Sequence, residues 1–315
     1  MPEWESIPVR WESPLMRAIG RAIRPLAVHE FNRRLVLEAE RTKAEILLAF
    51  KGTFVQASTL TRLRSMGVRS ICFYPDVSFR THGPYLPTAL PQYDWIFTTK
   101  SFGIQDLRDQ LGVHRSSLVR HAFDPDLHRP ITPTAADLER YGCDVSFIGT
   151  WSPKKERILR ELHMRLPDVH IRIWGAQWSK ADRKWGMEGI VEGQTVEGEE
   201  YVRAIASSKI NLAILSENRP GASAGDQITS RTFHIPACGG FMLHERTQEL
   251  LEVLSEPSEV MCFRDTDELV AHVGNLINDN TRRALIAARG RQRIAASNSW
   301  DHRIRDIINY PTSSA

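Results

Sequence analysis

The residues best suited to chemistry lie together between Ala224 and Glu245, in the run Ala-Gly-Asp-Gln-Ile-Thr-Ser-Arg-Thr-Phe-His-Ile-Pro-Ala-Cys-Gly-Gly-Phe-Met-Leu-His-Glu. The pattern predicts a glycine-bearing loop, one short helix, a Gly-Gly stop and a buried strand. Thr229 or Ser230 is expected to cap the helix, so that its first amides and positive dipole end face an anion. Arg231 would lie in the first turn, where a cation opposes the dipole and is well placed to bind phosphate.

The spacing inside this run resembles a known signature. Asp226 and His234 stand 234 − 226 = 8 positions apart, one before the helix and one within it. This resembles the E-x(7)-E signature of group 1 (family 4-like) glycosyltransferases, closed by an E-A-x-A-C-G run. Here His-Ile-Pro-Ala-Cys-Gly occupies 234–239, and Asp226 and His234 replace the two glutamates. The Ile-Pro-Ala-Cys-Gly-Gly form looks more like the branch that contains the spore-maturation-protein (CgeB-like) family. A helix–strand junction of any α/β protein is the alternative interpretation.

A second run, His121 to Pro130, resembles the segment N-G-x-D-P-x-x-F-x-P that leaves the first domain of the same enzymes. Asp124, Pro125 and Pro130 match that pattern in place. The segment is proline-rich and polar, which is typical of an interdomain connection.

Apolar runs alternate with helical patterns along most of the chain, which predicts parallel sheets covered by helices. We expect strands at 45–50, 68–74, 93–98, 116–121, 143–148, 169–174, 211–215, 241–243 and 260–264. Helices are expected at 58–66, 101–111, 154–166 and 201–208, with further helices to 296 and a last one from 299. An earlier helical period, within 15–40, carries arginines and contains Pro25, which should kink or split it.

The resemblance implies a GT-B fold, an α/β architecture of two Rossmann-like doubly wound parallel-sheet domains. We expect an acceptor domain at 1–130, a nucleotide-sugar domain at 131–298, and a terminal helix at 299–315 that crosses back to the first domain. No segment before Glu45 has a strand pattern. The first domain is therefore expected to be shortened by its first strand–helix unit.

Two residues of the first domain are candidates for catalysis because ligands bind beyond the carboxyl ends of parallel strands. Asp76 and His82 follow a predicted strand and lie six positions apart. Either could act as a base toward an acceptor hydroxyl or support a cationic transition state. A surface turn with a Gly-Pro break explains the same residues equally well.

The second domain offers a set of donor-binding candidates. Gly149 allows close backbone approach, and Lys154, Lys155 and Arg157 lie in the first turn of the following helix. The resemblance implies a diphosphate clamp there and base recognition through backbone near 196–198. The donor-binding candidates are Gly149, Thr150, Lys154, Arg157, Trp174, Gly175, Val196, Glu197, Gly198, Thr229, Ser230, Arg231 and His234. A solvated basic helix start and a core tryptophan are the alternatives.

The implied reaction moves a sugar from a nucleotide diphosphate-sugar to an acceptor hydroxyl, with retention and without a metal or other cofactor. Asp226 is expected to contact the donor sugar, as a third catalytic candidate. His234 is expected to face the ribose or phosphate, which would favour its cationic form.

Composition and charge limit the functional classes to which the chain can belong. The 315 residues carry a formal charge of +3, too small to indicate nucleic acid, and the arginines are dispersed. The four cysteines lie far apart and no apolar run approaches the ~20 residues that span a bilayer, so we expect a cytoplasmic protein with free thiols. The basic stretch at 15–40 is compatible with peripheral contact to the inner face of the membrane.

Two further functions fit the same residues. One is a nucleotide-sugar epimerase of the same architecture, for which Asp76 is the best acidic candidate in the first domain. The other is a non-catalytic sugar-nucleotide-binding protein that assembles a surface or spore coat. Turnover of a nucleotide-sugar to free sugar, to an epimer, or not at all distinguishes the three.

Overall fold

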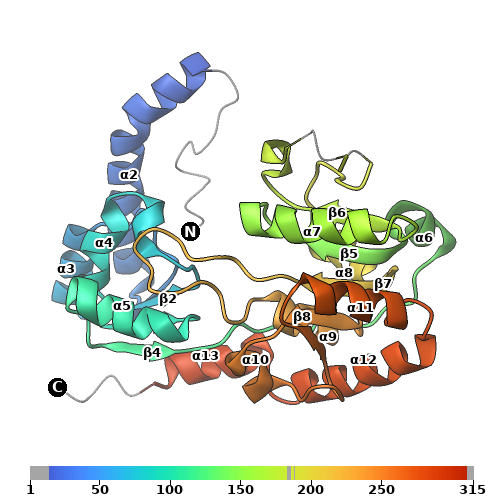
Figure 1. Ribbon diagram of the computed structural model, residues 1–315. Helices are drawn as coiled ribbons and strands as arrows, with labels where there is room; N and C mark the ends of the chain where they lie inside the picture. Colours follow the sequence, from blue (N-terminus) through green and yellow to red (C-terminus); the bar gives the residue numbers. More distant parts are fainter. Residues whose placement is uncertain (1–13, 183–185, 188, 311–315) are drawn as a thin grey trace. The chain divides into compact units, whose positions relative to one another are not determined.

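The computed structural model describes residues 14–182, 186–187 and 189–310, with side-chain surroundings from residue 23 onward. These residues form two compact units (Figure 1). Unit 1 contains the chain up to Arg120 together with Asn218–Ala224 and Tyr310, and unit 2 contains His121–Glu217 and Gly225–Asn309. The chain therefore leaves unit 2 after Glu217, contributes seven residues to unit 1, and returns at Gly225.

Unit 1 is a parallel sheet of four strands in the order β1-β2-β3-β4. Its elements are α2 (Pro14–Thr42), β1 (Ile46–Phe50), α3 (Ala57–Ser65), β2 (Arg69–Tyr74), η1 (Phe79–His82), α4 (Tyr85–Ala89), η2 (Leu90–Gln92), β3 (Trp95–Thr98), α5 (Ser101–Leu111) and β4 (Ser116–Leu118). The central strands are mainly apolar, from Ile71 to Tyr74 in β2 and from Trp95 to Phe97 in β3, as strands covered on both faces should be. Cys72, for example, is buried and pairs in register with Ile96.

Unit 2 is a parallel sheet of five strands in the order β6-β5-β7-β8-β9. Its elements are α6 (Ala135–Tyr141), β5 (Cys143–Ile148), α7 (Pro153–Arg165), β6 (Ile171–Trp174), η3 (Trp178–Lys180), α8 (Gly198–Ala206), β7 (Ser208–Ala213), α9 (Arg231–Ala237), β8 (Met242–Glu245), α10 (Gln248–Val253), β9 (Met261–Phe263), α11 (Thr266–Leu276), α12 (Asn280–Ala295) and α13 (Trp300–Ile308). The chain moves from β5 to β6 on one side and then to β7 on the other. The connections therefore diverge between β5 and β7, and at such a switch point a crevice opens beyond the strands.

Each face of the second sheet is covered by its own helices. Val145 and Phe147 of β5 pack against α7 and α11 on one face, where Leu159 and Leu269 are fully buried. The other face packs against α8 and α9, through residues such as Phe233. Burying one such side chain contributes about 1.5–3 kcal/mol, so this core fixes the strand ends on which the candidate site is built.

The expected strand and helix order is confirmed, with shifts of a few residues at the ends and a β4 shorter than expected. The expectation for Pro25 is wrong in part, because α2 continues through it as one helix. In the part of the chain that the structure describes, no helix is both long and apolar enough to cross a membrane.

Candidate functional site

Arg231 lies at the carboxyl ends of β5 and β7 in unit 2, at the switch point. It is the first residue of α9, and its guanidinium donates to the carbonyl oxygens of Ile214 (2.8 Å) and Ile148 (3.4 Å). Its charge lies 5.4 Å above the Phe147 ring. Desolvation lowers the pKa of Arg231, although the nearby Asp226 carboxylate works in the opposite direction. A half-buried guanidinium with one edge held by carbonyls is prepared to bind an anion with its other donors.

Two glycines let the strand ends approach each other beside Arg231. Gly175 has φ +140, and a Cβ built on it would lie 2.1 Å from the Gly149 carbonyl oxygen. The Gly149 amide donates to the Trp174 carbonyl at 2.9 Å, and Trp178 Nε1 donates to the Gly149 oxygen at 2.9 Å. Any side chain at 175 would force these backbones apart.

The start of α7 brings two lysines to the same edge. Ser152 caps the helix through Lys155 N, and its hydroxyl donates to Glu217 at 2.7 Å. Lys154 Nζ lies 2.6 Å from Glu245 Oε1, so this residue, which we expected to bind the diphosphate, forms an ion pair within the protein. Lys155 is buried, and its Nζ donates to Thr150 O and Ser216 Oγ, each at 3.1 Å.

The remaining candidates on this edge are more accessible. Arg157 and Thr150 are exposed, as are Glu197 and Gly198 at the start of α8. Gly198 has φ +55, a backbone conformation that favours glycine. Thr150 follows β5 closely, Arg157 lies in α7, and Glu197 and Gly198 begin α8.

Trp174 and Val196 are core residues. Trp174 is 1% exposed and packs between Tyr141 and Arg172, whose guanidinium lies 5.0 Å from its ring. Val196 is buried in the same cluster. The alternative of a core tryptophan therefore holds for Trp174, whose ring is almost fully buried.

The loop before α9, residues 216–226, is joined by a backbone hydrogen bond at its two ends, and its middle residues pack within unit 1. The Asp226 amide donates to the Ser216 carbonyl at 2.9 Å, next to Lys155. The tip, Asn218–Ala224, packs within unit 1, where Ser78 Oγ donates to Pro220 O (2.7 Å) and Gln110 Nε2 to Gly221 O (2.8 Å). The Ser223 amide donates to Asp106 at 3.0 Å. Nothing in the local sequence indicated this path.

The expected capping of α9 by Thr229 or Ser230 is wrong. Ser230 has helical backbone angles and its side chain makes no cap hydrogen bond. The Thr232 hydroxyl instead accepts from the Thr229 amide at 3.1 Å and donates to His244 Nε2 at 2.9 Å. His244 donates through Nδ1 to the Glu245 carbonyl, and burial lowers its pKa to about 4. This buried chain holds the start of α9 on β8.

His234 differs from expectation. Its Nε2 donates to the Ala122 carbonyl at 3.0 Å, and its ring stacks on His128 with centroids 4.0 Å apart. Burial, reinforced by His128, lowers the pKa of His234 to about 3. The expectation of a cationic His234 is therefore wrong, because the ring is desolvated beside a second imidazole.

A cavity of about 650 Å³ adjoins Gly175 and Trp178, between the loop after β6 and residues 193–195. This volume is within the range of sites that hold drug-sized ligands. Its lining includes backbone of Gly193 and side chains such as Gln177 and Met187. It offers room for an organic group beside the carboxyl end of β6.

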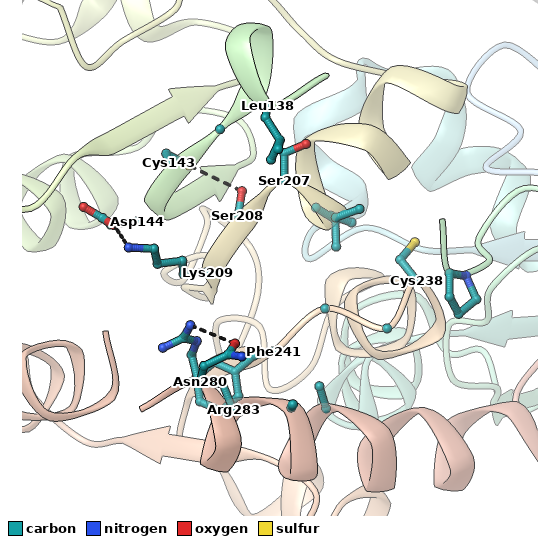
Figure 2. Close-up of a pocket in the computed structure, with 18 of the residues that line it drawn as sticks. Leu138, Cys143, Asp144, Ser207, Ser208, Lys209, Cys238, Phe241, Asn280 and Arg283 are labelled. Carbon is teal, nitrogen blue, oxygen red and sulfur yellow. Dashed lines mark hydrogen bonds and ion pairs between the residues drawn. The ribbon is translucent and has the colours of Figure 1, made fainter. Parts of the chain in front are cut away.

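A second cavity of about 630 Å³ lies at the opposite edge, at the amino ends of β5 and β7 (Figure 2). Its charges have partners within the protein: Lys209 lies 2.7 Å from Asp144, and Arg283 donates to the Ile277 carbonyl at 2.7 Å and to Asn280. None of the predicted site residues lines it. We therefore place the candidate site at the carboxyl edge.

In unit 1 the structure brings Asp76 and His82 together. His82 Nε2 lies 3.0 Å from Asp76 Oδ2, and Lys51 Nζ lies 2.6 Å from the same oxygen. Burial raises the pKa of Asp76, but His82 and Lys51 outweigh it and hold this pKa well below its usual range. An ionised Asp76 only accepts, so the His82 ring donates to it through Nε2. Lys51 directly follows β1, so the rule that ligands bind at the carboxyl ends of parallel strands selects it as well, and its backbone has a φ of +69.

The comparisons agree on the fold. Residues 154–309 match a family model described as glycosyl transferase-like, and no curated protein matches the chain. Sucrose-phosphate synthase from Thermosynechococcus elongatus has 10% identity and a TM-score of 0.60 over 87% of this chain and 75% of that one. Anabaena HepE, solved with UDP-glucose, has 12% identity and a TM-score of 0.64 over 88% and 80%. A glycosyltransferase from Rickettsia africae has 10% identity and a TM-score of 0.61 over 97% and 85%. The chain therefore has the GT-B fold.

Proposed function

We propose that this GT-B protein transfers a sugar from a nucleotide diphosphate-sugar to an acceptor hydroxyl. One observation carries the proposal: Arg231, beside Asp226, presents its guanidinium at the switch point of unit 2. The same residues lie in the run that resembles group 1 glycosyltransferases, and the match to a glycosyl transferase-like family over 154–309 supports the reading.

The diphosphate would bind at the carboxyl edge of β5, β7 and β8. Arg231 would supply N–H donors to the diphosphate. The start of α7 would contribute the positive end of its dipole and the ammonium of Lys154, which would interact with both the diphosphate and Glu245. These cations would take the role that a divalent metal plays in other sites, so we propose a metal-independent reaction. Gly149, Thr150 and Gly175 would allow close approach, and the adjoining cavity or the 197–198 backbone would receive the base.

Group transfer would break the bond between the anomeric carbon and the diphosphate oxygen and form one to the acceptor oxygen. His82 Nδ1 would take the acceptor proton, and Asp76 with Lys51 would orient His82. Arg231 would stabilise the charge on the leaving diphosphate, and Asp226 would contact the sugar. We propose retention and a hexosyl donor from the resemblance of the Asp226–Gly239 run, which also underlies our hypothesis of a CgeB-like branch.

His234, Trp174 and Val196 would contribute indirectly. The neutral His234 would fix α9 on the segment that begins unit 2, through Ala122 and His128. Trp174 and Val196 would form the floor beneath the strand ends. A cytoplasmic location, peripheral membrane contact through 15–40, and the limits 1–130, 131–298 and 299–315 stay predictions.

Calorimetric titration with UDP, GDP and ADP tests the donor site, and UDP is the first probe because HepE was solved with UDP and UDP-glucose. We expect saturable binding of one nucleotide, and slow release of free sugar from the matching nucleotide-sugar. Formation of an epimer of the nucleotide-sugar would instead support the epimerase. Binding without turnover in the presence of diverse acceptors would support the assembly protein, and no nucleotide binding would refute all three.

A further inference from the structure

A polar pocket in unit 1 gathers three arginines around one carboxylate. It has a volume of about 470 Å³ and is lined by Arg64, Gly67, Val68, Arg69, Asp94 and Arg115. Arg69 begins β2, while Asp94 and Arg115 directly precede β3 and β4. Because these strands are parallel, the pocket lies at their amino ends, opposite the edge that carries Asp76.

Protein acceptors hold two of the guanidiniums in place. Arg64 Nε lies 3.1 Å from Asp94 Oδ1, and its Nη2 donates to the Gln92 carbonyl. Arg115 Nη2 donates to the carbonyls of Pro91 and Tyr93 at 3.3 and 3.4 Å. A guanidinium has five N–H donors, so both side chains keep donors for a ligand while their positions are fixed. Such an arrangement costs little ordering entropy when an anion binds.

The single carboxylate of Asp94 does not balance the positive charge of the three arginines that line the pocket. Asp94 Oδ2 accepts from the Ser70 amide (2.7 Å) and the Ser70 hydroxyl (2.9 Å). These bonds fix the Asp94 side chain, which in turn positions Arg64. Of the described residues that line the pocket, three are cationic and one is anionic, so the formal charge is 3 − 1 = +2. Three guanidiniums gathered in one concave site repel each other and attract a dianion.

We propose that this arginine pocket binds a phosphate group carried by a small molecule or a lipid headgroup. Guanidinium N–H pairs match phosphate oxygens in geometry as well as charge. Gly67, at φ +82, has no atom within 4 Å of where a Cβ would lie, so the turn leaves space for the ligand. The pocket is separate from the proposed donor site, which lies in unit 2, and its ligand would act as a regulator or an anchor.

Titration of the intact protein with inorganic phosphate at constant ionic strength tests the proposal. We expect saturable binding that Arg115→Ala weakens at least tenfold, about 1.4 kcal/mol. Arg62→Ala is the matched control, because Arg62 lies on α3 like Arg64 but pairs with Glu40 outside the pocket. It should change the affinity less than twofold. Thermal melts check that each variant is folded.

Two further arms separate the outcomes. Arg231→Met reports any phosphate bound in unit 2, and Arg115→Ala should leave UDP binding unchanged, so each proposal can fail alone. Sedimentation with phosphatidic acid vesicles, against phosphatidylcholine, distinguishes a headgroup from a soluble phosphate. Equal affinity of wild type, Arg62→Ala and Arg115→Ala for both probes, or no binding to either, overturns the proposal.

Discussion

Replacing Arg231 by Met separates the proposed anion-binding role of this side chain from its structural role. Methionine keeps an unbranched stem that can pack on Phe147, but it has no donors and no charge. The change removes the hydrogen bonds to the Ile214 and Ile148 carbonyls together with the N–H groups proposed to face the diphosphate.

The two roles predict different magnitudes. Of the two carbonyl bonds, only the one to Ile214, at 2.8 Å, has good length, and losing it costs ~1.5–3 kcal/mol. Removing a charge whose pKa is already lowered by desolvation offsets part of that loss. We therefore expect a net change in unfolding free energy of ~0–2 kcal/mol. UDP binding should weaken by ~1.5–3 kcal/mol, roughly 10- to 150-fold, because a charge-assisted contact is lost.

Denaturant unfolding and calorimetric titration with UDP measure the two quantities on the same preparation. Arg165→Met is the control, since Arg165 lies in the last turn of α7 and pairs with Asp267. It should leave UDP affinity unchanged. Unaltered UDP affinity in folded Arg231→Met would refute the phosphate role. A stability loss above ~4 kcal/mol would show instead that Arg231 serves mainly to hold the strand ends.

Three other changes test separate parts of the molecule. Asp76→Asn and His82→Ala should each lower turnover at least tenfold and change UDP affinity less than twofold, and full activity in both would remove them from the mechanism. In the wild-type protein the folded-state pKa of His244, about 4, lies below its usual value of 6.5. His244 therefore contributes its full stabilisation above about pH 6.5, and the free energy of unfolding falls by ~3 kcal/mol as the pH is lowered to 4. His244→Gln should remove this loss, so that the stability of the variant depends less on pH in the acid range. Urea titrations at pH 4.5 and 7.5 measure this, and equal pH slopes in both proteins would contradict it. Gly221→Val should destabilise by ~1–3 kcal/mol, because Gly221 has φ +81 and a Cβ there would lie 2.5 Å from Arg80 Cδ; a melting temperature equal to wild type would show that the loop tip is not docked.

Local pattern in the sequence determined most of the secondary structure and the position of the site edge. Apolar runs and helical periods indicated the strands and helices because burial on a sheet face or helix stripe leaves a regular trace. The helix starts also follow from local sequence, because Ser152 directly before Pro153 caps α7 and Ser299 caps α13, as hydroxyl residues at these positions commonly do. The rule that ligands bind at the carboxyl ends of parallel strands then selected Asp76 and His82. Gly149 was selected because it allows close backbone approach, and the run before α9 because it resembles the group 1 glycosyltransferase signature.

Only the tertiary structure decided which partner each charged group has. Lys154 pairs with Glu245 across 91 positions, and the guanidinium of Arg231 is held by two carbonyls from different strands. His234 became a neutral, stacked ring because a second imidazole meets it inside a desolvated contact. A carboxylate, an ammonium or an imidazole is recognisable in the sequence. Its charge state and its free donors depend on distances of a few ångströms between elements far apart in the chain, and folding alone brings those elements together.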